Sequence, residues 1–206
     1  KGRGKFYDAT GAIRDVIQNH LLMVVGYLAM EPPNSIEADR LRDEQVKVFR
    51  AIRRLHKDNV VRGQFRGYRD EPGVATGSTV ETFAAVRLDI DSWRWQGVPF
   101  FIRTGKRLKA LQTELRLVLK SPPVRGFKHA KKMPEPNQIV VKLDPTTGVR
   151  VTVDAHRGDE EGAGQIDLDV EFAAQGGEGA TPYEVLLEAA MRGDGMRFTR
   201  QDGVEE

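Results

Sequence analysis

Residues 80–91 read VETFAAVRLDID, and the alternation in this stretch decides the fold class. Every second position holds a side chain suited to the interior of a sheet, namely Val80, Thr82, Ala84, Val86, Leu88 and Ile90. The positions between them are mostly charged. A period of two is typical of a strand with one buried face and one polar face. The same period returns at 115–119, 139–143, 149–153 and 166–172.

These strands follow one another without helix-length segments between them. This order predicts a mostly antiparallel sheet rather than a stack of βαβ units. Residues 144–148, DPTTG, lie between two of the strands and predict a hairpin. Stretches rich in Pro and Gly at 121–136 and 176–179 are predicted to be loops. The predicted fold class is therefore α+β, with a large, mostly antiparallel sheet packed with helices.

Helical periodicity precedes the strands. The first helix is predicted to begin after an N-cap at Asp8 and to end before Pro32. Its apolar face repeats at spacings of three and four, through Ile13, Val16, Ile17, His20, Val24 and Leu28. A second helix is predicted over 36–55. Its expected inner face consists of Leu41, Gln45, Val48, Ile52 and Leu55.

A last helix follows the strands and has sequence signals at both ends. Residues 181–184, TPYE, predict a capping box with Pro at the first helical position, and Gly193 predicts the C-terminal cap. The expected inner face consists of Leu186, Leu187, Ala190 and Met191.

The composition excludes several classes of function. The 206 residues are 39% hydrophobic and 30% charged, which is enough apolar material for a core. A net charge of only +2 argues against a nucleic-acid or membrane-surface role driven by bulk charge. The chain has no cysteine and no apolar run of membrane-spanning length. We expect one domain over 1–206, cut from a longer chain, because the sequence lacks an initial Met and helix-like sequence begins almost at once.

His20 is the first candidate for chemistry. A histidine on an apolar helical face is more often a satisfied core residue than a functional group, and the stripe alone leaves both interpretations open. Asp15 lies five residues earlier, which is about 140° around an ideal α-helix. We therefore expect no direct pairing on one face, although the two side chains could line opposite walls of one pocket.

The stretch FIRTGKR at 101–107 is a second candidate. Its Gly-Lys pair resembles the end of a phosphate-binding loop, but the preceding glycine is Gly97 and an Arg follows the Lys, which excludes a nucleotide P-loop. Four cations still lie close together, namely Arg103, Lys106, Arg107 and Lys109. Such a cluster suits an anion, and a basic loop that faces water explains the spacing equally well.

Other patterns carry less weight. VRGQFRGYRD at 61–70 interleaves Arg with Phe65 and Tyr68, as a surface for single-stranded nucleic acid would, but the stretch is short and no nucleic-acid role is predicted. The remaining histidines, His56, His129 and His156, have no partners at metal-ligand spacing, so no metal site is predicted. From the residues alone, the sequence predicts an α+β domain with a candidate anion site.

Several of these stretches together resemble the glucose-6-phosphate dehydrogenase family. The matching strings include RDVIQNHLL at 14–22, AMEPP at 29–33, VRGQFRGYRDEPGV at 61–74 and WRWQGVPFFIRTGKRL at 93–108. The similarity continues at 183–205 and is weakest between 121 and 180. It identifies the chain with the C-terminal domain of the family, which completes the sugar-phosphate site and forms the dimer. The Rossmann-like N-terminal domain that binds NADP is absent from this chain.

The resemblance implies roles for three of the candidates. His20 is implied to be the general base that removes the proton of the C1 hydroxyl of glucose 6-phosphate, as hydride passes to NADP and 6-phosphogluconolactone forms. Imidazole titrates near neutral pH and suits this task. Asp15 is implied to accept hydrogen bonds from sugar hydroxyls, and Lys106 is implied to contact the substrate.

The resemblance also implies a cytoplasmic enzyme of the pentose phosphate pathway that forms a homodimer through the sheet. The sheet face with Phe83, Ala85 and Val118 is less polar than exposure to water requires, which favours a partner there. The choice of NADP over NAD depends on residues of the absent domain.

Three positions depart from the family pattern. The family usually has a Lys or Arg five residues after Lys106, where this chain has Leu111, and Lys109 is close enough in sequence to substitute. Asp144 stands where the family has a glutamine near the substrate. Arg116 fits part of a second, structural NADP site of some members, but no cofactor-binding residue can be assigned. Two alternatives stay open: a dehydrogenase of the same fold for another sugar phosphate, and a non-enzymatic dimerisation or anion-binding module.

Overall fold

The computed structural model describes residues 3–121, 135–156, 163–175 and 180–205, and the chain divides into two compact units. The first unit comprises 1–108 and 182–206, and the second comprises 109–181.

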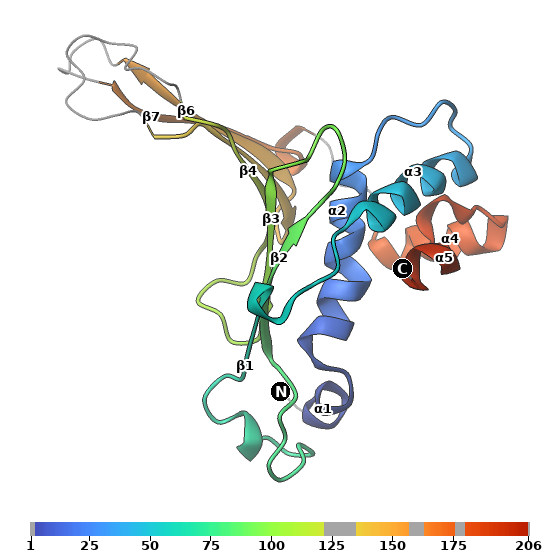
Figure 1. Cartoon of the computed structure of the whole chain (residues 1–206), viewed down its shortest axis with the longest axis vertical. Helices are drawn as coiled ribbons and strands as arrows, with labels where there is room; N and C mark the ends of the chain where they lie inside the picture. Colours follow the sequence, from blue (N-terminus) through green and yellow to red (C-terminus); the bar gives the residue numbers. More distant parts are fainter. Residues whose placement is uncertain (1–2, 122–134, 157–162, 176–179, 206) are drawn as a thin grey trace. The chain divides into compact units, whose positions relative to one another are not determined.

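The helices are α1 (Gly4–Ala12), the π-helix η1 (Ile13–Leu21), α2 (Leu22–Ala29), α3 (Ala38–Ala51), α4 (Pro182–Arg192) and α5 (Gln201–Glu205). Short 3₁₀ turns are η2 (Lys57–Asn59), η3 (Tyr68–Asp70), η4 (Ala173–Gln175) and η5 (Gly195–Arg197). The strands are β1 (Val60–Gly63), β2 (Phe83–Asp89), β3 (Pro99–Gly105), β4 (Thr113–Val118), β5 (Gln138–Asp144), β6 (Gly148–His156) and β7 (Ala163–Glu171) (Figure 1).

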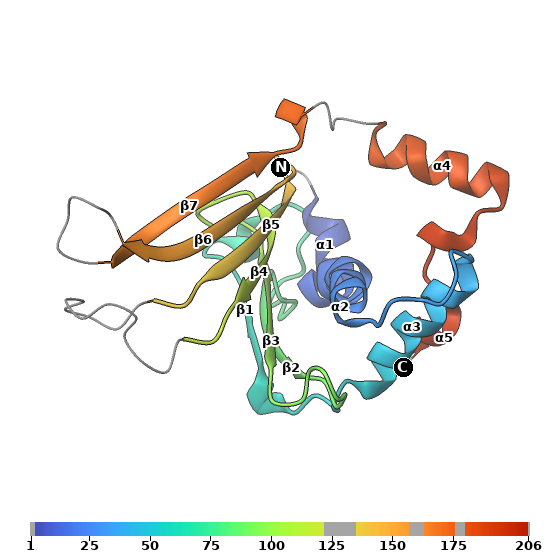
Figure 2. The same ribbon diagram turned by 90° about the horizontal axis from the view of Figure 1, so that it is seen from above.

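Strand β2 forms the centre of the first unit's sheet. The order is β1-β2-β3, and both pairs are antiparallel. The alternation at 80–91 correctly predicts which face is covered, because Ala84, Val86 and Leu88 are all buried. They share one core with Ile17 of η1 and Val25 of α2. Figures 1 and 2 show α2 alongside this sheet, with α3 and α5 on the other side of the helix.

The first helical segment differs from the prediction at its start. Asp8 is not an N-cap, because α1 already begins at Gly4. Its carboxylate instead accepts hydrogen bonds from the Tyr68 hydroxyl at 3.1 Å, from the Ala75 N–H at 3.0 Å and from the Ser78 hydroxyl. Asp8 therefore holds the loop over 68–78 against α1, a role that no local pattern indicates.

The segment formed by η1 and α2 ends as predicted, at Ala29 before the prolines. Ile17 of η1 and Val25 and Ala29 of α2 form its buried side. Val24 is only partly covered, and His20 is exposed. The predicted stripe assumed a regular α-helix, and the π-helical turns of η1 change which positions share a face.

The other helices agree with the prediction in position more than in orientation. Helix α3 lies within the predicted range 36–55 and buries Gln45 and Val48. Helix α4 begins at Pro182, and Gly193 follows it with a φ of 67°, as a C-terminal cap requires. The predicted inner face of α4 is wrong, since Leu187 is 65% and Met191 is 88% exposed. Among the described residues α4 packs against the η5 turn, so only its C-terminal end buries a side chain, that of Ala189.

The second unit is built on a four-stranded sheet. Its order is β4-β5-β6-β7, every pair is antiparallel, and the predicted hairpin at 144–148 joins β5 to β6. The sequence predicted one large sheet, whereas the described strands form two, because no ladder joins β3 to β4 in the described stretch 99–118. The predicted loops at 121–136 and 176–179 fall largely outside the described residues. In the part of the chain that is described, no helix is long and apolar enough to cross a membrane.

Candidate active site

The helix that carries Asp15 and His20 is not an ordinary α-helix. Ile13–Leu21 form a π-helix, and the Leu22 N–H donates to the Ile17 carbonyl five residues earlier. Because each turn closes between residues five apart, Asp15 and His20 are expected to lie closer together around the helix than α-helical spacing would place them. The expected separation of about 140° assumed α-helical geometry, whereas this segment is π-helical. π-Helical turns are rare and occur frequently at functional sites.

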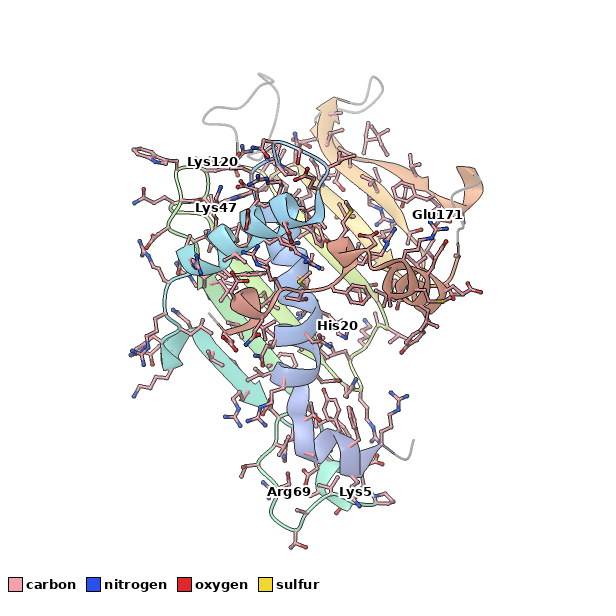
Figure 3. All side chains as sticks on the ribbon, turned by 90° about the vertical axis from the view of Figure 1, so that its right-hand side faces the viewer. Lys5, His20, Lys47, Arg69, Lys120 and Glu171 are labelled. Carbon is pink, nitrogen blue, oxygen red and sulfur yellow. The ribbon has the colours of Figure 1, made fainter. Side chains whose placement is uncertain are left out.

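His20 is exposed, which contradicts the interpretation of a buried core histidine. Ile17 is the buried residue of η1. Figure 3 marks His20 partway along this helical segment. No described residue forms a hydrogen bond or an ion pair with the His20 imidazole. Such a ring has a nitrogen available to accept a proton from a bound hydroxyl group.

Asp15 is partly buried and lies close to Tyr7 of α1. Burial raises the pKa of Tyr7 to about 12, and the negative charges of Asp15 and then Glu81 add to the increase. The phenol is therefore neutral at physiological pH. A neutral ring thus lies beside the carboxylate that the sequence singled out.

Glu81 fixes the start of η1. Its carboxylate accepts the Ile13 N–H at 3.0 Å, and its main-chain carbonyl accepts the Ala12 N–H at 3.0 Å. The other carboxylate oxygen lies 3.2 Å from Arg62 Nη2, and the residue is buried. The first N–H groups of a helix have no partner within the helix, so this carboxylate satisfies a donor and opposes the positive end of the helix dipole. Glu81 thus has the capping role that the sequence assigned to Asp8.

Thr82, the residue after Glu81, binds the main chain of Lys106. The Lys106 N–H donates to the carbonyl of buried Thr82 at 2.9 Å, just beyond the β2–β3 ladder, where Phe83 pairs with Gly105. The Lys106 ammonium lies over the Tyr7 ring, 4.8 Å from its centroid. Glu81 and Thr82, which directly precede β2, therefore fix both the helix η1 and the loop that carries Lys106.

The predicted cationic cluster has separate surroundings in the structure. Arg107 forms an ion pair with Glu71, and its guanidinium lies over the Phe65 ring, 4.3 Å from the centroid. Arg103 is exposed on β3, and Lys109 belongs to the second unit. The described contacts therefore do not gather the cations of the first unit into one anion pocket.

The aromatic residues at 61–70 have a structural role. Tyr68 is buried, and its ring meets the Phe65 ring edge-on with centroids 5.4 Å apart. Arg69 donates from Nε to the Ser78 carbonyl at 3.1 Å. These contacts hold the loop together, and a buried ring is not available to stack on nucleic-acid bases.

Lys109 and Asp144 lie in the second unit. Lys109 is exposed ahead of β4, and Asp144 is exposed at the end of β5. A concave surface of about 460 Å³ on this unit includes Asp144. Asp15, His20 and Lys106 all belong to the first unit, and a site that they share with Lys109 and Asp144 stays a prediction.

The charged residues at that concave surface largely pair with one another. Lys142 and Arg150 each form a 2.6 Å contact with Asp169, and these hydrogen bonds hold the pKa of its carboxyl below the usual range. Arg116 donates to the Gln138 side chain at 2.9 Å. These cations have protein partners, so the structure gives no separate reason to assign a structural NADP site there.

Sequence reasoning missed Tyr7 and Glu81. Glu81 caps a helix whose first residue lies 68 positions earlier, and no spacing rule connects such positions. Tyr7 lies in a helical run that gave no signal of its own. Within the described ranges, no group of three or more His, Cys, Asp and Glu side chains could hold a metal ion.

Comparison with known proteins gives consistent matches over the whole chain. Residues 1–206 match the family model "Glucose-6-phosphate dehydrogenase, C-terminal domain". The chain is 48% identical over 204 residues to glucose-6-phosphate 1-dehydrogenase 1 of Mycobacterium tuberculosis (strain CDC 1551 / Oshkosh), which covers 99% of this chain and 43% of that protein. The crystal structure of glucose-6-phosphate 1-dehydrogenase from Mycobacterium avium matches with a TM-score of 0.90 at 48% identity, over 100% of this chain and 44% of that one. A glucose-6-phosphate dehydrogenase in complex with its substrate glucose-6-phosphate matches with a TM-score of 0.87 at 32% identity, over 100% and 44% of the two chains. The chain therefore spans less than half the length of these relatives.

Proposed function

Because this chain belongs to the family of glucose-6-phosphate dehydrogenase C-terminal domains, we propose that 1–206 form the substrate-binding and dimerisation domain of an NADP-dependent glucose-6-phosphate dehydrogenase. A Rossmann-like N-terminal domain would complete the enzyme. Dinucleotide-binding folds are built from parallel βαβ units, whereas both sheets in the described residues are antiparallel. We therefore assign NADP binding to the N-terminal domain and expect the isolated chain to be inactive. On the resemblance alone, we assign the enzyme to the cytoplasm.

His20 is the proposed general base. When bound, NADP supplies the hydride acceptor, and the residues of this chain hold the sugar and move the proton. The imidazole accepts the proton of the C1 hydroxyl of glucose 6-phosphate, and the C1 oxygen becomes the lactone carbonyl as the C1 hydride leaves. The observation that supports this role is the exposed ring of His20, which has no partner among the described residues and shares the π-helix η1 with Asp15.

The other candidates are proposed to bind the sugar phosphate. Asp15 accepts hydrogen bonds from sugar hydroxyls, and the ammonium of Lys106 binds an oxygen of the anionic substrate. Lys106 has no ion-pair partner among the described residues, which leaves its charge for a ligand. From the second unit, Asp144 is proposed to accept a further hydroxyl hydrogen bond, and Lys109 to supply a second positive charge.

The test is NADP reduction by the full-length enzyme with glucose 6-phosphate. We expect His20→Asn to lower kcat by about 10²–10⁴-fold, because that is the usual contribution of a general base, with little change in KM. His56→Asn is the matched control, since His56 is another exposed histidine and its imidazole pairs with nearby Asp58. If His20→Asn turns over glucose 6-phosphate as fast as the wild type, His20 is not the general base. That result would favour a non-enzymatic role for the site around His20.

A second candidate function is the same reaction on a different sugar phosphate. Leu111 is 89% exposed at a position where the resemblance implies a cation, so the chain has one positive charge fewer there. The same assay with a panel of sugar phosphates distinguishes the two functions. A higher kcat/KM for another sugar phosphate than for glucose 6-phosphate would favour this candidate.

We also propose that the enzyme is a homodimer formed through the four-stranded sheet. Apolar side chains remain exposed on both faces of that sheet within the second unit, including Val118 at 60% and Leu168 at 57%. Isolated exposed apolar residues are common, but several on one flat sheet favour association with a partner. A second copy of the chain is the partner that the family resemblance implies.

A further inference from the structure

Tyr7 combines deep burial with an unused polar group. It is only 6% exposed, and its hydroxyl is buried without a hydrogen-bond partner among the described residues. Leaving a buried hydroxyl unpaired costs stability, so such groups in native proteins call for an explanation. Because the hydroxyl has no partner there, the contacts that Tyr7 makes are those of its ring.

The Tyr7 ring carries the ammonium of Lys106 on its face, at 4.8 Å from the centroid. A cation over an aromatic face is attracted by the negative π-surface of the ring. Such a contact holds the lysine head without placing an acceptor oxygen on its N–H donors. A tyrosine phenol is protonated at physiological pH, and burial raises the pKa of Tyr7 further, to about 12, so the ring adds no negative charge that would neutralise the lysine.

The neighbouring cation shows the opposite arrangement. Arg107 also lies over an aromatic ring, that of Phe65, but its guanidinium is in addition bound by the Glu71 carboxylate. Lys106 has no carboxylate partner in the described part of the chain. Of these two adjacent cations, only Lys106 is held in place and yet left with its donors for a ligand.

We propose that Tyr7 is a positioning residue that holds the Lys106 ammonium through its ring face and so presents that cation to the anionic sugar substrate. This inference rests on the proposed function of Lys106 in substrate binding. The ring is the part of Tyr7 that acts, so an aromatic residue should substitute for it and an aliphatic one should not. The effect should appear in substrate affinity and not in the chemical step.

The first test compares Tyr7→Leu with Tyr7→Phe in the full-length enzyme. We expect Tyr7→Leu to raise the KM for glucose 6-phosphate by about 3- to 30-fold with kcat little changed, because that range corresponds to the loss of one cation–π contact. Tyr7→Phe should restore the wild-type KM. Phe65→Leu, which removes the ring beneath Arg107, is the matched control and should leave KM unchanged. An equal rise in KM for Tyr7→Phe and Tyr7→Leu would overturn the proposal.

A double-mutant cycle separates positioning from general damage to the fold. In a Lys106→Ala background, Tyr7→Leu should have no further effect on KM, since the cation it positions is already absent. An undiminished effect in that background would show that Tyr7 acts by another route.

A readout without turnover keeps this result distinct from the proposed function. Reductive ¹³C-methylation labels the accessible lysine amines, and the Lys106 signal is the one that Lys106→Ala removes. The ring current of Tyr7 beneath these methyl groups should shift that NMR signal upfield. The shift should be present in the wild type and in Tyr7→Phe and absent in Tyr7→Leu. No shift in the wild type would refute the Tyr7–Lys106 contact itself. A different outcome is that the wild type shows the upfield shift but Lys106→Ala does not change KM. That outcome would reject Lys106 as a substrate-binding residue, and the positioning role of Tyr7 with it.

Discussion

Gly11 is the position where one added methyl group tests how η1, the helix that carries the proposed base, is held. Its backbone angles, φ 76° and ψ 168°, fall in a region that is essentially restricted to glycine. A Cβ atom at this position would lie 2.6 Å from Glu81 Oε1, the oxygen that accepts the Ile13 N–H. Gly11→Ala therefore adds backbone strain and displaces the carboxylate that caps η1.

The expected cost has two parts. The backbone conformation costs an alanine about 1–3 kcal/mol. Loss of a hydrogen bond to a charged group adds about 1.5–3 kcal/mol. We therefore expect Gly11→Ala to lower the free energy of unfolding of the first unit by about 3–5 kcal/mol. Gly67→Ala is the matched control, because Gly67 also has a positive φ, 85°, but a Cβ there would meet only Asp70 Oδ2 at 3.8 Å. It should cost about 1–2 kcal/mol.

Tryptophan fluorescence during urea unfolding is a suitable assay for this prediction. Both tryptophans of the chain, Trp93 and Trp95, belong to the first unit, so their emission reports on that unit. Trp95 is the informative one, since its indole donates to the Ala29 carbonyl at 3.0 Å and its ring lies 5.1 Å from that of Phe100. Equal losses of stability in Gly11→Ala and Gly67→Ala would refute the capping role of Glu81.

Two further predictions concern acid stability and assembly. The Ser78 hydroxyl, followed by the Ala75 N–H, holds the pKa of Asp8 below its usual value. The ionised Asp8 therefore stabilises the fold at pH values above its unfolded-state pKa, and this stabilisation is lost as the pH falls through its folded-state pKa. Asp8→Asn should consequently reduce the loss of unfolding free energy at acid pH, measured by urea titration at several pH values. An acid loss of stability equal to that of the wild type would contradict this prediction. Leu168 and Val118 lie on opposite faces of the four-stranded sheet. If the dimer forms through one of these faces, Leu168→Asp or Val118→Asp should give the full-length enzyme a monomeric mass in light scattering. A dimeric mass for both variants would reject the sheet interface.

The sequence predicted the strands better than their assembly into sheets. Alternation is a local property, and it identified the buried face of β2 because Ala84, Val86 and Leu88 repeat with the period of the backbone. Strand β1 has only four residues and offers no such repeat. Alternation also does not state which strands pair, so the separation of β3 from β4 could not be predicted.

The candidate site shows a similar division between residue identity and geometry. The resemblance of RDVIQNH to a known family singled out Asp15 and His20, yet spacing on an ideal helix placed them on different faces. The π-helical turns that carry both residues left no recognisable signal in the sequence. The cap at Glu81 comes from a distant part of the chain, and only the folded structure reveals it.

The contacts around 81–82 also explain how two distant parts of the chain keep a fixed relation. Glu81 binds the start of the helix that carries His20, and the carbonyl of the next residue, Thr82, binds the main chain of Lys106. A shift of this strand end would therefore move the proposed base and the proposed cation together. The path from the start of η1 to the main chain of Lys106 is short, since it runs through one peptide unit and two main-chain hydrogen bonds rather than along the sheet. Reacting groups need such control because small displacements in a site cost large factors in rate. The burial of Glu81 and Thr82 is thus as important to the proposed chemistry as the exposure of His20.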